Sequence, residues 1–472
     1  MLGKFASTLL LGAVMGMSLS LTSGGALAQS KPPATCNITP KAFSTWFDGK
    51  YVKKNGAVTF ADSVGFPLQN TACDFYKWSH QMFLWMTSPS GGDLVLDSPT
   101  FYDVSFDKSG NATYVPNQTG VGNNKFALRG SKPQVITPAG QAGGADTLLS
   151  LNGSLVYFAL HVNDVYAWFN TAVSNSVISP TATFPTTPAD LSAIVAYAKS
   201  NGVVLKDAKA LTMELKTAWI DWATIPAAQQ AEYLTISAAV PNYVQTTNAT
   251  TWTISTVQPT TVKKLALVGL HVVGPVQGHP EMVWATFEHR RNAPDNTHFV
   301  QTKTGQAVVV PYNSTGTWNF MSNRGALAGL VSQMTVDNAS GALVATSGNV
   351  IQANNVYRAM PWGNAPTPAS ANNNSQLISL NADIRGRLTK LGDVRGNYFQ
   401  VGAVWTQDGS IPANPTDVGK QIGSKMLASS TMETYHQTDK NGCFGCHYGP
   451  NSLSVSHLFS AQNKPLVEPA KK

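Results

Sequence analysis

The chain carries the stretch Cys-Phe-Gly-Cys-His at residues 443–447. Two thiols at this spacing add across the two vinyl groups of one porphyrin, and the adjacent imidazole then lies beneath the iron as an axial ligand. A Cys-x-x-Cys pair alone also occurs in redox-active dithiols, zinc half-sites and disulfides. The histidine that follows at once favours one covalent haem c on Cys443 and Cys446, with His447 as the iron ligand.

The position of this motif limits the fold. Only 25 residues follow His447 in the 472-residue chain, and none of them is methionine. A small haem domain that begins with the motif and supplies a downstream methionine ligand is therefore impossible. The haem has to be covered by the residues before the motif or by the short tail.

The second axial ligand has three alternatives. His457 lies ten residues beyond His447, and apolar neighbours that suit a haem face surround it: Leu453, Val455, Leu458 and Phe459. A methionine or histidine from elsewhere is the second alternative, with His436, Met432, Met426 and Met360 as candidates. The third is an iron without a second protein ligand. Two protein ligands favour electron transfer, whereas an open position lets a small substrate bind.

The N-terminus has the pattern of an export signal. Lys4 precedes an apolar stretch that runs to Leu21, and Ala26-Leu27-Ala28 has the small residues of a signal-peptidase site. A membrane anchor is the alternative, but Ser and Gly interrupt the apolar stretch and no later one is long enough to span a bilayer. We expect residues 1–28 to be removed and the protein to be periplasmic or secreted, where bacteria attach haem to this motif.

Composition favours a β-rich exported protein with many turns. Charged residues make up only 12% of the chain, about half the usual share. The formal net charge is +7, but no Lys/Arg run is longer than a pair. The scattered basic residues therefore do not predict nucleic-acid binding.

The other two cysteines, Cys36 and Cys73, lie near the mature N-terminus. In an oxidising compartment we expect them to form a disulfide. Two free buried thiols are the alternative.

Hydrophobic periodicity predicts both helices and strands. The expected helices cover residues 74–86, with Asp74 as N-cap, 189–200, 376–390 and 418–435. The expected strands cover residues 94–96, 101–106, 134–137, 211–222, 233–240, 251–257, 262–273, 282–289 and 398–405. Residues 155–161 and 165–169 flank Asn163-Asp164, which predicts a β-hairpin.

This order predicts a β-rich α+β fold with an antiparallel sandwich or barrel-like body and a C-terminal helical haem-binding segment. The expected divisions are a signal peptide at 1–28, the body at 29–411 and the haem segment at 412–472.

Two residues of the body are weak candidates for catalysis. Glu214 shares a strand face with Lys216, and His271 lies on a later strand. Carboxylates and bases in apolar surroundings have shifted pKa values and can act as acid or base. The alternative is a structural network of charges on adjacent strands. No metal-binding motif, nucleophile elbow or phosphate-binding loop is present.

The residues from Met432 to His457 resemble the C-terminal haem segment of bacterial exported c-type cytochromes. The longer chain, with Phe-Leu-Trp at 83–85 and Trp-Ala-Thr-Phe-Glu-His at 284–289, is similar to large secreted bacterial proteins of no known activity. The layout also resembles that of hydroxylamine-oxidising cytochromes, from which no lysine is carried over. The resemblance to cytochromes c implies thioether bonds at Cys443 and Cys446 and axial ligation by His447.

We therefore expect a periplasmic mono-haem c-type cytochrome that transfers single electrons. The alternatives are a haem-dependent oxidoreductase with an open distal site under the β-rich body, and a haem-based binding or sensor protein. The expected partner is a redox protein or a small-molecule electron donor or acceptor, with no nucleic acid and no membrane span after signal cleavage.

Overall fold

The computed structural model describes residues 35–107, 109–116, 140–313, 315–322, 330–346, 349–439 and 441–468, which all belong to one unit (residues 32–472). The predicted signal peptide (1–28) and the predicted strand 134–137 lie outside these residues. Cys36 and Cys73 form a disulfide, as predicted. It joins the segment before α1 (Pro40–Ser44) to α2 (Ala72–Met86).

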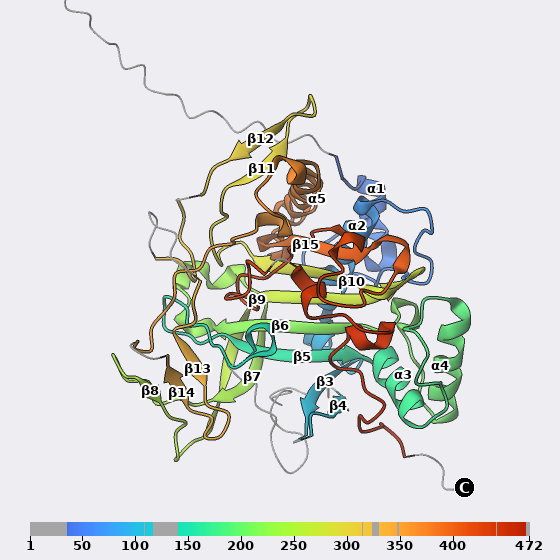
Figure 1. The fold of residues 1–472 in the computed structure, drawn as a ribbon, viewed down its shortest axis with the longest axis horizontal. Helices are drawn as coiled ribbons and strands as arrows, with labels where there is room; N and C mark the ends of the chain where they lie inside the picture. The colour runs from blue at the N-terminus through green and yellow to red at the C-terminus, as the bar shows by residue number, and fades with distance from the viewer. Residues whose placement is uncertain are drawn as a thin grey trace, which may run out of the picture. The chain divides into compact units, whose positions relative to one another are not determined.

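An antiparallel sheet of nine strands lies at the centre of the described residues (Figure 1). Its order is β16 (Gln421–Gly423), β15 (Tyr398–Thr406), β10 (His279–His289), β9 (Thr260–Val276), β6 (Glu214–Asp221), β5 (Tyr157–Asn163), β3 (Phe101–Phe106) and β4 (Ala112–Pro116), and β7 (Thr235–Pro241) also pairs with β9. The predicted β-rich α+β class is confirmed. A barrel is wrong, because this sheet is open, with β16 and β4 at its ends.

Two helices cover one face of the sheet. In α2, Phe83 stacks on Phe287 of β10 with ring centroids 4.4 Å apart, and Phe75 stacks on Trp405 of β15 at 4.0 Å. The helix begins two residues earlier than predicted, and Asp74 is not its N-cap. The N-cap is Thr71, whose backbone N–H and hydroxyl donate hydrogen bonds to Asp74 in the first turn. The second helix, α5 (Ala371–Lys390), buries an apolar stripe with helical spacing: Leu377, Leu380, Ile384 and Leu388. This layer is helical, so the expected sandwich of two sheets is not formed.

The predicted hairpin at 155–169 is wrong. β5 ends at Asn163, and α3 (Asp164–Ser174) follows directly. The Asn163 side chain accepts a hydrogen bond from the backbone N–H of Tyr166 and so caps the helix. The Asn-Asp pair therefore starts a helix here instead of making a turn between strands.

The C-terminal segment covers the opposite face of the sheet (Figure 1, red). The predicted helix at 418–435 is wrong: a 3-10 turn at Val418–Lys420 leads into β16, and irregular turns follow. Within 441–468 the chain forms only two further 3-10 turns, Gly442–Gly445 and Ser452–Val455. The segment follows the sheet closely, since a Cβ atom on Gly269 of β9 would lie 2.6 Å from Oγ1 of Thr431. Contacts with the sheet, and not the local helical pattern of the sequence, therefore determine the conformation of this segment.

The remaining elements are short, apart from α4 (Pro188–Ser200), which was predicted at 189–200. Of the predicted strand 94–96 only Leu94 lies in a strand, β2 (Asp93–Leu94), and a 3-10 turn follows at Val95–Asp97. The predicted strand 251–257 is reduced to β8 (Thr251–Trp252). No helix in the described residues has both the length and the apolar character to span a bilayer. The minor strands are β1 (Pro89–Ser90), β2 (Asp93–Leu94), β8 (Thr251–Trp252), β11 (His298–Gln301), β12 (Ala307–Val310), β13 (Met334–Val336) and β14 (Leu343–Ala345).

Candidate functional site

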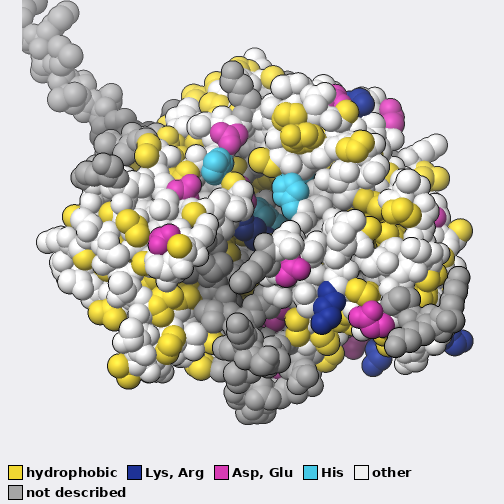
Figure 2. All heavy atoms as spheres, turned by 60° about the horizontal axis from the view of Figure 1, so that its bottom comes forward, with side chains coloured by type: hydrophobic (Ala, Val, Ile, Leu, Met, Phe, Trp, Pro, Cys, Tyr) yellow, Lys and Arg dark blue, Asp and Glu magenta, His cyan; other side chains and the backbone are white. Residues whose placement is uncertain are grey.

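A cavity of about 900 Å³ lies between the sheet and the C-terminal segment. Figure 2 shows it as a hollow with histidine side chains at its rim and a basic side chain at depth. Its size is within the range of small-molecule and cofactor sites. The residues of the Cys-x-x-Cys-His motif and both candidate catalytic residues line this one cavity: Cys443, Cys446, His447, Glu214 and His271.

Strand register fixes the sheet side of the cavity. Glu214 of β6 pairs with Val273 of β9, which pairs with Trp284 of β10. Two residues further along each strand, Lys216 pairs with His271, which pairs with Thr286. Side chains two apart on a strand share a face and lie about 7 Å apart. The cavity wall therefore has a mixed row, Glu214, Val273 and Trp284. Beside it lies a polar row, Lys216, His271 and Thr286.

The motif itself forms a single tight turn. The backbone N–H groups of Cys446 and His447 both donate to the carbonyl of Cys443, over 3.1 and 2.9 Å. Gly442 begins the turn with φ +51°, and a Cβ atom there would lie 2.7 Å from the carbonyl oxygen of Lys425. Glycine is required at this position by both conformation and space.

His447 is partly buried and lies between the rings of Trp284 and His457. Its ring lies 4.1 Å from that of Trp284, and burial lowers its pKa to about 3, so it is neutral. Its Nδ1 lies 2.8 Å from the carbonyl oxygen of Val455 and must carry the proton of that hydrogen bond. Its Nε2 is then the unprotonated nitrogen. Metal-binding histidines use this arrangement, in which a backbone carbonyl fixes the tautomer.

His457 is close to His447 but does not face it across an iron position. The two rings stack at 4.3 Å with an interplanar angle of 23°. Nε2 of His457 lies 3.1 Å from the carbonyl oxygen of Cys446. Two axial ligands approach an iron atom through their nitrogens from opposite sides, whereas these rings lie face to face. This conformation does not support His457 as the second ligand.

Two other candidate ligands, Met432 and His436, are held by contacts with protein groups. Met432 is fully buried in an apolar cluster with Ala218 and Val268 under the C-terminal segment. His436 lies at the cavity and makes a 3.1 Å contact with Asp439. In the described part of the chain, no methionine lines the cavity.

Glu433 is the site residue that the sequence did not reveal. Its carboxylate lies 2.9 Å from Nε2 of His271 and 3.7 Å from Nζ of Lys216, and it accepts from the Ser429 backbone. Burial alone would raise the pKa of Glu433, but His271, Lys216 and Ser429 together lower it to about 2. It is therefore ionised. It lies 162 residues from His271, so no motif spacing links the two.

Glu214 lines the same cavity, but its pKa is shifted in the opposite direction from that of Glu433. It accepts a hydrogen bond from the Ser456 hydroxyl, and burial raises its pKa to about 7. Ser456 follows Val455, whose carbonyl holds His447. The predicted shift in the pKa of Glu214 thus has a physical cause, which is desolvation.

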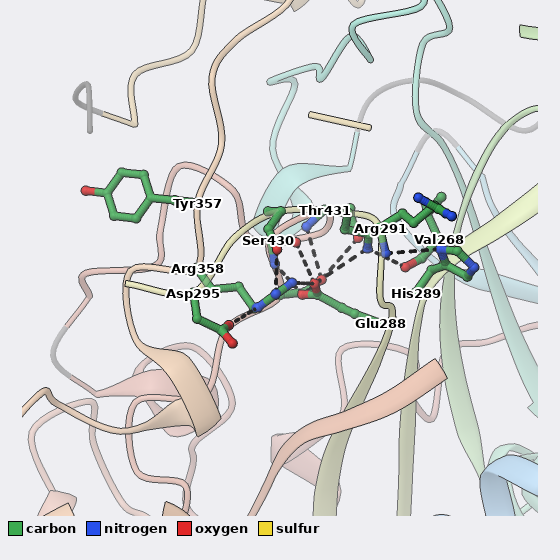
Figure 3. Close-up of polar contacts among 12 residues, drawn as sticks. Val268, Glu288, His289, Arg291, Asp295, Tyr357, Arg358, Ser430 and Thr431 are labelled. Atoms are coloured by element: carbon green, nitrogen blue, oxygen red, sulfur yellow. Dashed lines mark hydrogen bonds and ion pairs between the residues drawn. The ribbon is translucent and has the colours of Figure 1, made fainter. Parts of the chain in front are cut away.

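The carboxylate of Glu288 also fixes the C-terminal segment to the sheet (Figure 3). Glu288 of β10 is fully buried and accepts hydrogen bonds from the backbone and hydroxyl of Ser430, over 2.6 Å each. Its charge is balanced by Arg358, whose NH1 lies 3.1 Å away. Arg358 also pairs with Asp295 at 2.5 Å. This network fixes the loop that carries Glu433 and is structural.

The motif cysteines are free thiols that both line the cavity. They are not joined in a disulfide, and burial raises the pKa of Cys443 well above its ordinary value. A redox-active dithiol needs a lowered thiol pKa. In the described residues, no three His, Cys, Asp or Glu side chains converge as a structural zinc site requires. The chain matches no protein-family model, no curated protein and no solved structure.

Proposed function

We propose that the protein is a mono-haem c-type cytochrome that transfers single electrons. One haem would be bound in the cavity by thioether bonds to Cys443 and Cys446, with His447 as axial ligand. The observation that supports this most directly is the tautomer of His447, since its hydrogen bond to Val455 leaves Nε2 unprotonated on a residue that lines the same cavity as both cysteines.

The apolar part of the cavity wall also supports the proposal. Apolar side chains from the sheet and from the C-terminal segment line it, among them Val273, Trp284, Leu427 and Leu458. When bound, the haem supplies a metal centre that accepts and releases one electron. The protein's part is to hold His447 in one orientation and to keep water from the iron.

The attachment is tested on protein exported from a host that matures c-type cytochromes. We expect the mass of the denatured protein to include one haem, and C443A/C446A to lack it. H447A is expected to keep the thioether bonds but to lose the wild-type ligand-field spectrum. A wild-type protein without covalent haem would contradict the proposal, and C36A/C73A is the control for loss of two unrelated cysteines.

A haem-dependent oxidoreductase is the second candidate, with a haem-based sensor as its non-catalytic form. The observation that favours it is the presence of Glu214, Lys216, His271 and Glu433 in the same cavity. An electron carrier has no need of acid–base groups there, whereas an enzyme uses them for proton transfer.

Carbon monoxide distinguishes the two candidates. The reduced spectrum of an electron carrier with two protein ligands stays unchanged under the gas. A spectrum that shifts on addition of the gas identifies an open iron position, and with it the oxidoreductase or sensor.

Export to the periplasm, or secretion, is the location that we propose. It is supported by the signal-peptide pattern at 1–28 and is compatible with the disulfide between Cys36 and Cys73. The electron partner would be a redox protein or a small molecule. Protease protection of the mature protein in intact cells tests the location.

A further inference from the structure

Lys216 is an unusual side chain for the wall of a cavity. It projects from the central strand β6, its side chain is only 16% exposed, and burial lowers its pKa. Its ammonium group has three protons. One is donated to the carbonyl of Gly140, and a second faces Glu433 over a long 3.7 Å. The ammonium group also lies 5.4 Å from the centroid of the Phe158 ring, so beyond Gly140 and Glu433 it has no further oxygen partner among the contacts of the described residues.

Glu433 and His271 fix this ammonium group from the other side. Oε1 of Glu433 lies between His271 and Lys216, and Oε2 accepts from the Ser429 backbone. His271 is itself held by Thr286, whose hydroxyl lies 2.9 Å from its Nδ1. Both ring nitrogens of His271 are occupied, so Lys216 is the side chain of this cluster with donor capacity left.

A purely structural ion pair would be sealed by packing. Here Lys216, His271 and Glu433 retain 16–21% exposure and line the cavity that contains the haem motif. His447 packs over Trp284, and the polar row begins two residues further along the same strands. Lys216 therefore projects from the row beside the one against which His447 packs, and side chains of neighbouring rows are about 7 Å apart along the strands.

We propose that Lys216 is the hydrogen-bond donor of a small-ligand site in this cavity. The ligand would be a small molecule or anion with a terminal oxygen, nitrogen or halide lone pair, bound at an open iron position beside Lys216. Glu433 and His271 are positioning residues, which hold the ammonium group and compete for its protons. This inference rests on the second candidate function, the haem-dependent oxidoreductase or sensor, in which the second axial position of the haem would take an exogenous ligand instead of a protein side chain.

The first experiment measures fluoride binding to the oxidised holoprotein by visible spectroscopy. Fluoride accepts hydrogen bonds strongly, so K216M is expected to weaken its affinity by about tenfold or more. K216R keeps the charge and the donor and is expected to restore most of the affinity. E433Q is expected to strengthen it, because the competing carboxylate is removed.

The second experiment measures the C–O stretching frequency of the reduced carbon monoxide complex by infrared spectroscopy. A positive donor near the bound gas lowers this frequency, so K216M is expected to raise it. E433Q is expected to lower it, because a negative charge is removed. A role of Lys216 in folding alone predicts no opposite shifts in the two variants.

Each failure has a distinct meaning. Absence of covalent haem contradicts the proposed function itself. Covalent haem that binds neither fluoride nor carbon monoxide leaves the electron carrier intact and overturns this inference. Ligand binding with unchanged affinity and frequency in K216M also overturns it. If K216M does not fold, the expected changes in E433Q decide, and their absence contradicts the proposed site.

Discussion

Glu214 and Glu433 line one cavity and have opposite pKa shifts. Burial raises the pKa of Glu214 to about 7 with a hydroxyl as its hydrogen-bond partner. Despite its own burial, Glu433 has a pKa of about 2 because His271 and Lys216 face it. Neighbouring rows of the sheet supply the two environments. The charge of each carboxylate is therefore decided by its hydrogen-bond and ion-pair partners and not by how deeply it is buried.

For Glu214 we predict a loss of stability as pH rises. Its pKa in the folded state exceeds the ordinary value of 4.5, so the unfolded chain releases the proton first. The free energy of unfolding should fall by up to about 3 kcal/mol between pH 4.5 and 7, at about 1.4 kcal/mol per pKa unit. Urea unfolding at several pH values should show this fall in the wild type and its absence in E214Q. Parallel profiles would contradict the assigned state of Glu214.

For Glu433 the sign is reversed. Its stabilisation is fully present above the ordinary pKa of 4.5 and is lost as pH falls through about 2. E433Q should therefore lower the free energy of unfolding at pH 7 by about 3 kcal/mol, with a smaller difference in acid. The same unfolding series measures it, and E214Q is the matched control in the same cavity. An equal effect of E433Q at pH 7 and pH 2 would show that its charge is not responsible.

At the scale of elements, the C-terminal segment is held by close approach to the sheet. A Cβ atom on Gly269 would lie 2.6 Å from Oγ1 of Thr431 and 3.1 Å from Cε of Met432. On β15, a Cβ atom on Gly402 would clash with Oγ of Ser424. Two sheet glycines thus let the irregular segment pack directly against the sheet.

G269A is predicted to destabilise the protein by about 1–3 kcal/mol, because the added methyl group overpacks this contact. Thermal unfolding measures the change. The matched control is G386A in α5, where a Cβ atom meets nothing within 4 Å. That substitution should stabilise the protein by roughly 0.5–1 kcal/mol, because alanine favours a helix interior. A neutral G269A would show that the segment can move away from β9.

At the scale of the whole molecule, the disulfide and the cavity are separate features. The disulfide closes a loop of 37 residues and fixes the N-terminal segment to α2, which covers the face of the sheet opposite the cavity. C36A/C73A should lower the free energy of unfolding by about 3–4 kcal/mol in the chain-entropy model. The visible spectrum of the holoprotein should stay that of the wild type. A changed spectrum would show that the two faces of the sheet are coupled.

Much of the element order was predictable because its causes are local. The stripe of α2, the alternation in β9 and β10 and the spacing of Cys443, Cys446 and His447 can all be recognised within short windows of sequence. The misassigned stretches are those in which a local pattern serves two structures. Asn163 suits a turn and a helix cap equally, and only the contacts of α3 select the cap.

The sequence by itself determined the β-rich class and the residue pair that forms the disulfide, and it predicts covalent haem at Cys443 and Cys446 and export of the protein. Tertiary structure alone decided that Glu214, Lys216 and His271 share a cavity with the motif, that Glu433 joins them, and that His457 stacks on His447. The physical reason is range. Spacing and periodicity act within a few residues, whereas the cavity is built from strand register and from a segment that returns across more than 160 residues of chain.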